Sequence, residues 1–318
     1  MKVVFCGTPD WAVPSLRALV ASSHAVVGVV TATDKPSGRS GRPVASAVKQ
    51  MAEELAAGPL LQPETLRSRE ARDSILRLGA DALVVVAYGR ILPGRLLDGP
   101  PHGAVNLHFS LLPRHRGASP VQHAILAGDA VTGVTTMLMD RGLDTGPVLL
   151  QREVGIEPDE TTPELGSRLA SDGSDLLIET LDRLERGAVH PHPQDDRLAT
   201  GAPRLSREMG AVRWSWPAAR IERMTRAFLP WPPVVATGPR GPLRLTAASA
   251  VDRPAPHGCE PGTVLGRAAD AVEIACGDGS VLRVREVQPA NRKTMGAASA
   301  LSGGYLVAGE RLRDGGAD

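Results

Sequence analysis

The 318-residue sequence predicts an α/β fold: a doubly wound, mostly parallel β-sheet, followed by a small β-barrel or sandwich. Apolar, β-branched runs alternate with helical patterns through the first half of the chain, as in βαβ units. The run at 82–87 is apolar at every position, which is typical of a strand buried on both faces. After residue 230, short β-like runs separated by glycine and proline indicate the barrel or sandwich.

The elements of the first half follow this alternation in chain order. Pro14 stands in the first turn of the first helix, where its missing N–H costs no hydrogen bond. We expect a strand at 3–6, a helix at 11–20, a strand at 25–31, helices at 44–55 and 66–78, strands at 82–87 and 104–107, a helix at 119–127 and a strand at 133–139. Ligands of such sheets bind beyond the carboxyl ends of the strands.

The second half begins with a long amphipathic helix at 164–186. The stretch 190–205 is rich in proline and aspartate and has no hydrophobic period, so it is predicted to be a linker. A helix at 218–228 follows, and then strands at 234–237, 243–247, 262–266, 271–276 and 280–287. The predicted domains are therefore 1–189 and 206–318, joined by the linker.

Composition excludes several classes of protein. No apolar run reaches the 18 or so residues of a membrane span, and the apolar start is too short for a signal peptide, so a cytoplasmic protein is expected. Cys6, Cys259 and Cys276 are far apart and form no C-x-x-C pair, which argues against disulfides and against a zinc site. The pair His190 and His192 has no third ligand nearby, so no metal is expected. No self-association motif is visible, and we expect a monomer.

The net charge of +1 hides an asymmetry between the two halves of the chain. Residues 1–200 carry 20 Lys and Arg against 24 Asp and Glu, whereas residues 201–318 carry 16 against 11. A basic C-terminal part is compatible with a polyanionic partner, although differences of this size are also common in domains that bind nothing.

Asn106 and His108 form the most informative pair of residues in the chain. They stand at i and i+2 at the end of a predicted strand, so both side chains point to one face. An amide can donate to a developing oxyanion, and an imidazole can move protons near neutral pH. The alternative is that both residues satisfy loop carbonyls at the strand end.

A carboxylate could complete this pair. Asp144 lies between Gly142 and Gly146, where a loop could bend back to the histidine, and we prefer it to Asp140, which is expected to cap a turn. His115, flanked by two arginines, is expected on the surface of a solvated loop or as a substrate contact.

Two other loops have compositions that bear on ligand binding. The turn after the first strand, Gly7-Thr-Pro-Asp, lacks the second and third glycines of a dinucleotide motif, which argues against a nicotinamide oxidoreductase. The loop 33–43 is basic and contains glycine. It is either a flexible surface connection or a mobile loop that grips phosphate through Arg39 and Arg42.

Several motifs together resemble those of the methionyl-tRNA formyltransferase family, and the resemblance extends from Val3 to about Leu312. They are G-T-P-D near the start, V-V-A-Y-G-R-I-L-P at 85–93, N-x-H-x-S-L-L-P at 106–113, R-G-A-S-P at 116–120, D-x-G-L-D-T-G at 140–146, R-A-F-L-P-W-P at 226–232 and P-G-T at 261–263. The resemblance implies the formyltransferase fold with a C-terminal OB-like barrel that contacts tRNA. It also implies transfer of the formyl group of 10-formyltetrahydrofolate to the α-amine of initiator methionyl-tRNA, in translation initiation.

The resemblance also implies roles for individual residues. By matching position, Asn106, His108 and Asp144 are the catalytic residues, and Arg39 reads the acceptor end of the tRNA, with Arg42 beside it. The folate-binding stretches are Ser110, Leu111, Leu112 and Pro113, and Tyr88, Gly89, Ile91 and Leu92, the latter partly through backbone groups. Phe109, in a position usually filled by a small residue, and His115, where an aromatic is common, depart from the family pattern.

The mechanism expected from these residues needs no metal and no covalent enzyme intermediate. Asn106 and His108 would both donate to the formyl oxygen, and Asp144 would help to route the proton. The alternatives are a formyltransferase for an amino-sugar nucleotide, a formyltetrahydrofolate hydrolase domain, and a non-catalytic RNA-binding protein. The basic loop and the basic C-terminal part favour tRNA over the first two, and the intact trio argues against the third.

Overall fold

A computed structural model describes residues 1–37 and 42–316, which group into two compact units. Unit 1 contains residues 1–120, 130–156 and 164–203, and unit 2 contains residues 121–129, 157–163 and 204–318. Two segments of the first half therefore group with the C-terminal part, which no sequence pattern indicated. The boundaries 1–189 and 206–318 stay a prediction. Within the described residues, no helix has the length and apolar character needed to cross a membrane.

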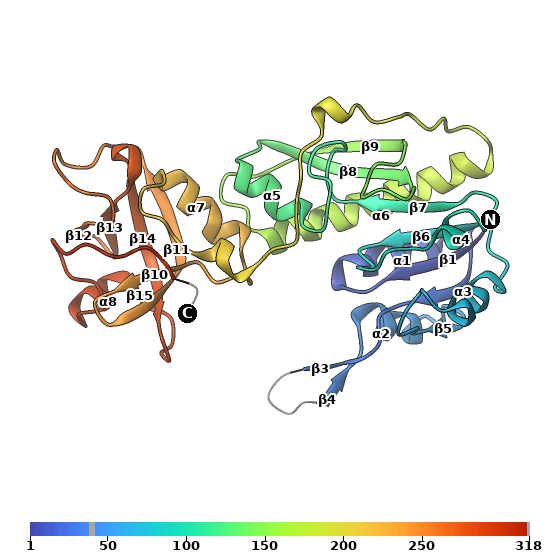
Figure 1. The fold of residues 1–318 in the computed structure, drawn as a ribbon, viewed down its shortest axis with the longest axis horizontal. Helices are drawn as coiled ribbons and strands as arrows, with labels where there is room; N and C mark the ends of the chain where they lie inside the picture. The colour runs from blue at the N-terminus through green and yellow to red at the C-terminus, as the bar shows by residue number, and fades with distance from the viewer. Residues whose placement is uncertain (38–41, 317–318) are drawn as a thin grey trace. The chain divides into compact units, whose positions relative to one another are not determined.

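Unit 1 is built on one seven-stranded sheet, coloured from blue to yellow-green in Figure 1. Its spatial order is β5 (Leu60–Leu61), β2 (Ala25–Val30), β1 (Lys2–Gly7), β6 (Ala82–Val86), β7 (Ala104–His108), β8 (Val131–Leu138) and β9 (Val148–Gly155). The first five strands pair in parallel, and the last two are antiparallel. The predicted doubly wound, mostly parallel sheet is confirmed, with β9 as a strand that the sequence analysis missed.

Helices cover both faces of this sheet. On one face, Val4, Cys6 and Val85 form a core with Ile75 of α3 (Arg69–Leu76) and Leu96 of α4 (Gly94–Leu97). On the other face, α6 (Thr162–Glu185) approaches so closely that a side chain at Gly173 would meet Leu107 of β7. Because alternate residues of a strand face opposite ways, Asn106 and His108 lie on the α3 and α4 face.

Helix starts in unit 1 follow local capping. α1 (Val13–Ala21) has a proline in its first turn, as predicted. α2 (Ala47–Glu54) and α3 begin three residues later than predicted, because the Ser46 and Ser68 hydroxyls accept from the backbone N–H groups of Lys49 and Ala71.

The loop predicted at 33–43 has strand-paired ends. β3 (Lys35–Ser37) and β4 (Arg42–Val44) form an antiparallel pair, with Lys35 opposite Val44. The Asp34 carboxylate accepts from Lys49 Nζ at 2.7 Å and from Gln62 Nε2 at 2.7 Å, which fastens the base of this ribbon to α2. Arg39 lies outside the described residues, and the backbone of Arg42 belongs to β4.

Unit 2 contains an antiparallel sheet of six strands. Its order is β10 (Val235–Gly238), β11 (Gly241–Val251), β14 (Val281–Pro289), β13 (Ala271–Ala275) and β12 (Val264–Ala268), and β15 (Met295–Gly296) also pairs with β14. The C-terminal tail bonds to both edges, since Arg311 pairs with Thr263 and Arg313 with Thr237. The predicted C-terminal domain of short strands is therefore confirmed as an antiparallel sheet. Its helices are α5 (Pro120–Ala127), α7 (Ala218–Ala227) and α8 (Ala297–Ser302).

Candidate active site

Asn106 and His108 lie at the carboxyl end of β7, which is buried along its whole length. Their side chains share a face of the sheet, and they are 8% and 6% exposed. No hydrogen bond joins the Asn106 side chain to another described residue, and the residue is 8% exposed. Its amide atoms are not among the fully buried polar atoms without a partner, so solvent reaches them and a substrate atom can replace that solvent.

The two ring nitrogens of His108 have different surroundings. Nε2 lies 3.0 Å from the His115 carbonyl oxygen, which can only accept, so Nε2 carries the proton of the neutral ring. Nδ1 lies 3.8 Å from Asp144 Oδ2. Burial lowers the pKa of His108 below its usual value, against the raising effect of the Asp144 carboxylate. The ring is therefore neutral at pH 7, with Nδ1 available to accept a proton.

The Asp144 loop brings its carboxylate to the histidine. Asp144 adopts a left-handed backbone, with a φ of 54°, and its Oδ2 accepts from the Gly117 N–H at 2.8 Å. Gly146 must be glycine because a Cβ there would lie 1.8 Å from the Leu138 carbonyl oxygen. The structure thus brings Asp144 and His108 together, as the sequence predicted.

Asp140 has the structural position expected of it. Its Oδ1 accepts from the Gly142 N–H at 2.9 Å and from the Thr145 hydroxyl at 2.8 Å. These bonds close the turn that carries Asp144.

The expected folate stretch that follows β7 is a tightly bonded turn. The Ser110 hydroxyl donates to the Arg114 carbonyl at 2.6 Å, and Thr135 Oγ1 donates to the Ser110 carbonyl at 2.6 Å. Gln151 Nε2 donates to the Leu112 carbonyl at 2.8 Å. Thr135 and Gln151 lie on β8 and β9 and were missed in the sequence, because nothing local to them indicates that they hold this turn.

Two side chains of this stretch are buried inside the protein: Ser110 is fully buried and Leu112 is 4% exposed. Leu111 is half-buried over Gly133 of β8, and the Leu112–Pro113 peptide bond is cis. A ligand here would therefore meet Leu111, Pro113 and backbone groups.

The second expected folate stretch, residues 88–92, has both buried and exposed side chains. The Tyr88 ring and Leu92 belong to the core cluster on the α3 and α4 face and are 4% and 5% exposed. Burial raises the pKa of Tyr88 to about 12. Gly89 has a φ of 75°, and Ile91 is 90% exposed. Contacts from this stretch would come from backbone groups, as expected in part, and from Ile91.

Two expectations about loops need correction. His115 is 5% exposed and has a φ of 58°, so it is a buried residue of the loop beside His108 and not a surface residue. The predicted linker is also bonded into unit 1: His192 pairs with Val148, and Gly201 pairs with Arg116. Sequence patterns missed these pairings because the partner residues lie tens of positions away along the chain.

Comparison with known proteins agrees with this fold and site. Residues 1–181 match the family model described as Formyl transferase, and residues 204–304 match Formyl transferase, C-terminal domain. Proteins named methionyl-tRNA formyltransferase from Symbiobacterium thermophilum and Roseiflexus castenholzii are 46% and 48% identical over 98% of this chain. The matches cover 95% and 99% of those proteins.

The chain belongs to the methionyl-tRNA formyltransferase family.

Solved structures share the fold at lower identity. An N-formyltransferase from Helicobacter canadensis, in complex with folinic acid and dTDP-3-aminofucose, has a TM-score of 0.64 and 16% identity over 89% of this chain and 98% of that one. The sugar 3N-formyl transferase WlaRD has a TM-score of 0.65 and 16% identity over 92% and 99%.

The ring of Phe109, which directly follows β7, packs inside unit 1. It is 5% exposed and meets Trp11 edge to face, with ring centroids 6.1 Å apart. Trp11 in turn lies against α6 at Gly166, where any Cβ would lie 2.1 Å from the indole ring. The large residue thus continues a stack from β7 through Trp11 to α6.

Replacing Phe109 by alanine is expected to lower the free energy of unfolding by about 3–5 kcal/mol, because it removes a buried ring and its aromatic partner. Urea unfolding followed by tryptophan fluorescence measures this. Leu198→Ala, at a side chain 61% exposed, is the matched control and should change stability little. A cost for Phe109→Ala as small as that of the control would contradict the packing role.

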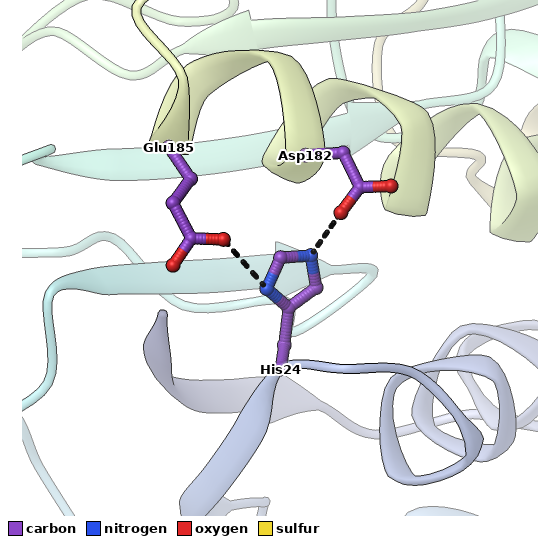
Figure 2. Close-up of side chains that lie close together, drawn as sticks. All are labelled: His24, Asp182 and Glu185. Atoms are coloured by element: carbon purple, nitrogen blue, oxygen red, sulfur yellow. Dashed lines mark ion pairs between the residues drawn. The ribbon is translucent and has the colours of Figure 1, made fainter.

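A second cluster of titratable groups lies at the amino end of β2 (Figure 2). His24 precedes β2, and its Nε2 lies 3.3 Å from Asp182 Oδ1 while its Nδ1 lies 3.9 Å from Glu185 Oε2. Each of these three side chains has an atom that could bind a metal ion, and these atoms all lie within 4.8 Å of one another. Among the described residues, no other such group of three is found. The Met1 α-ammonium group already donates to Glu185 at 2.6 Å, so the cluster holds a cation of the chain itself.

The His24 cluster predicts a pH dependence of stability. Burial and then the α-ammonium group lower the pKa of His24, although Asp182 and Glu185 act to raise it. The folded chain keeps the ring neutral where the unfolded chain protonates it, so stability is highest above the ordinary pKa of about 6.5 and falls as pH drops below it.

Thermal unfolding at several pH values tests this. His24→Gln should reduce the loss of Tm on acidification, whereas His190→Gln, at an exposed position, should leave the wild-type slope. An equal slope of Tm against pH in wild type and His24→Gln would show that His24 has the same pKa in the folded and unfolded chain.

Proposed function

We propose that this chain transfers the formyl group of 10-formyltetrahydrofolate to the α-amine of initiator methionyl-tRNA. The observation that carries the proposal is the approach of Asp144 to His108 beside Asn106 at a strand end, in a chain of this family. The cytoplasmic location, the monomeric state and the lack of a metal remain expectations from the sequence.

The reaction exchanges one acyl bond for another. The neutral amine attacks the formyl carbon, a C–N bond forms to the amine, and the bond to folate N10 breaks. The proton lost by the amine ends on N10. The folate supplies a formyl group on a nitrogen that can leave.

Asn106 is the proposed donor to the formyl oxygen as negative charge develops there. Its amide has no hydrogen-bond partner among the described residues and is reached by solvent, so a substrate oxygen can bond to it. The earlier expectation that His108 shares this role is revised, because the Nε2 proton is committed to the His115 carbonyl. A single fixed donor of this kind contributes a large electrostatic stabilisation.

His108 and Asp144 are the proposed proton-transfer pair. Nδ1 of the neutral ring can take the proton of the attacking amine, directly or through a water, and the carboxylate 3.8 Å away stabilises the charged ring that results. The charged ring can then return the proton to the leaving nitrogen.

The folate proposal rests on the two loops beside this pair. Ile91 presents an exposed apolar side chain next to the left-handed backbone of Gly89, and Leu111 and Pro113 are only partly buried. Apolar side chains and free backbone polar groups are what a flat heteroaromatic ring with polar edges needs. The residues present therefore fit a pterin.

Arg39 and Arg42 are the proposed contacts to the tRNA acceptor end. Arg39→Ala is expected to raise KM for the tRNA about tenfold, since a charge-assisted contact to phosphate is lost, with folate KM little changed. Steady-state kinetics with each substrate varied measures this. Arg69→Ala, at an exposed arginine of α3, is the control and should leave both KM values unchanged. A rise in folate KM for Arg39→Ala would contradict a role toward tRNA.

One assay tests the proposed function. Formyl transfer from 10-formyltetrahydrofolate is measured to initiator methionyl-tRNA, elongator methionyl-tRNA and an amino-sugar nucleotide. Highest kcat/KM with the initiator tRNA is expected. A preference for the sugar nucleotide, or release of formate without transfer, would overturn the proposal in favour of the two alternative formyl enzymes.

A further inference from the structure

The Gln194 side chain joins the two loops that hold the His108–Asp144 pair. Its Nε2 donates to the carbonyl oxygens of Asp144, at 2.9 Å, and Gly146, at 2.7 Å. These are the residues on either side of Thr145 in the loop that presents the carboxylate. No sequence motif pointed to Gln194, which lies within the predicted linker.

The oxygen of the Gln194 side-chain amide is also hydrogen-bonded. Gln194 Oε1 accepts from Nε of Arg116 at 3.0 Å and from its Nη2 at 2.8 Å, and Nη2 also donates to Asp196 at 2.8 Å. Arg116 directly precedes Gly117, whose N–H donates to the Asp144 carboxylate. The amide thus connects the backbone of the Asp144 loop to the loop that binds its side chain.

The backbone on both sides of Gln194 is anchored to unit 1. His192 exchanges two hydrogen bonds of 2.8 Å with Val148 at the start of β9. Farther along, the Arg116 N–H donates to the Thr200 carbonyl at 2.8 Å, and the Ala202 N–H donates to the Arg116 carbonyl at 2.7 Å. The backbone on both sides of Gln194 is therefore bonded to the same parts of unit 1 as its side chain: Val148 follows Gly146, and Arg116 is also the partner of the Gln194 oxygen.

Asp144 needs such support because of its backbone. A φ of 54° is a sparsely populated conformation for a residue with a side chain, and it persists where surrounding contacts determine it. The two bonds from Gln194 fall on this residue and on Gly146, so their loss would let the loop relax and carry Oδ2 away from His108 Nδ1.

We propose that Gln194 is a positioning residue, which holds the Asp144 carboxylate at its place beside His108. The kinetic consequence rests on the proposed function, whereas the geometric one does not. Besides burial, three groups act on the pKa of His108: the Asp144 carboxylate raises it, the hydrogen bond to the His115 carbonyl also raises it, and the His115 ring lowers it. The pKa of His108 therefore reports the carboxylate's position once the comparison with Asp144→Asn separates that effect from a shift of the His115 carbonyl.

The test is an NMR pH titration of the His108 ring in the full chain, with its signal assigned through His108→Gln. Gln194→Met keeps the length of the side chain and removes its hydrogen bonds to Arg116, Asp144 and Gly146, and Gln194→Ala is the second variant. Both are expected to lower the pKa of His108, as Asp144→Asn should. The double variant Gln194→Met/Asp144→Asn should match Asp144→Asn alone, because both changes act through one carboxylate.

Gln62→Met is the matched control, since Gln62 bridges the Ala32 carbonyl and Asp34 elsewhere in unit 1 and should leave the His108 titration unchanged. An unchanged His108 pKa in folded Gln194→Met, or a further decrease in the double variant, would overturn the proposal. If Gln194→Met or Gln194→Ala does not fold, the His108 titration of the other variant tests the proposal.

Kinetics then connects the position to the reaction. Gln194→Met is expected to lower kcat for formyl transfer about 10- to 100-fold at unchanged KM, as small misplacements of reacting groups do. Raised KM values at wild-type kcat would overturn the positioning role. If the wild-type chain transfers no formyl group at all, the proposed function fails, and the NMR titration still decides what Gln194 does.

Discussion

Replacing Asn106 by alanine is expected to lower kcat for formyl transfer by about 10²–10³-fold while both KM values stay close to wild type. Of the Asn106 and His108 side chains, the amide is the donor left for the formyl oxygen, because His108 Nε2 is bonded to the His115 carbonyl. Its contribution grows as the oxygen gains charge, so its loss falls on the transition state more than on the bound substrates.

Asn106→Asp sharpens this experiment. The carboxylate has the same shape but cannot donate, and it repels a developing negative charge, so kcat should fall at least as far as in Asn106→Ala. Single-turnover measurements with saturating substrates separate this loss from binding. Near-normal kcat in Asn106→Asp would show that the amide does not act on the formyl oxygen.

His108→Gln and Asp144→Asn are each expected to lower kcat by about 10²–10⁴-fold, the usual contribution of a positioned acid–base group. The two residues work as one unit across 3.8 Å, so the double variant should be little slower than the worse single variant. His102→Gln and Asp175→Asn, at positions away from the site, are matched controls for the two changes.

Losses of kcat that multiply in the double variant would mean that the two residues act separately.

The dependence of kcat on pH gives a further check. Burial lowers the pKa of His108, so the ring stays neutral somewhat below the pH at which an exposed histidine is half protonated. Asp144→Asn removes the raising effect of the carboxylate, and the ring should then stay neutral to still lower pH.

Strands could be predicted from the sequence where a local run of apolar residues shows that the strand is buried. The run at 82–86 is apolar at every position and forms β6, which is buried at every position. β9 was missed because its residues range from buried to exposed at the edge of the sheet, and its partners are set by the antiparallel return of β8. Direction and pairing of such a strand depend on contacts that a local pattern does not contain.

The site was predictable in part for the same reason. Asn106 and His108 share a strand face by spacing alone, and Gly142 and Gly146 marked the Asp144 loop. That Tyr88 faces the core, that His115 is buried, and that a segment without any motif supplies Gln194 depended on loop conformation and on partners 50 residues away. Hydrogen bonds across such separations leave no periodic signal.

The sequence by itself determined which chemical groups this protein brings to its reaction: an amide and an imidazole on one strand end, a carboxylate between glycines, and a basic loop. Only the tertiary structure decided which proton each group can use. The His115 carbonyl takes one nitrogen of His108, Asp144 faces the other, and Gln194 holds the carboxylate in place. The reason is physical: side-chain identity belongs to one residue, whereas the state of a proton depends on every group that folding brings around it.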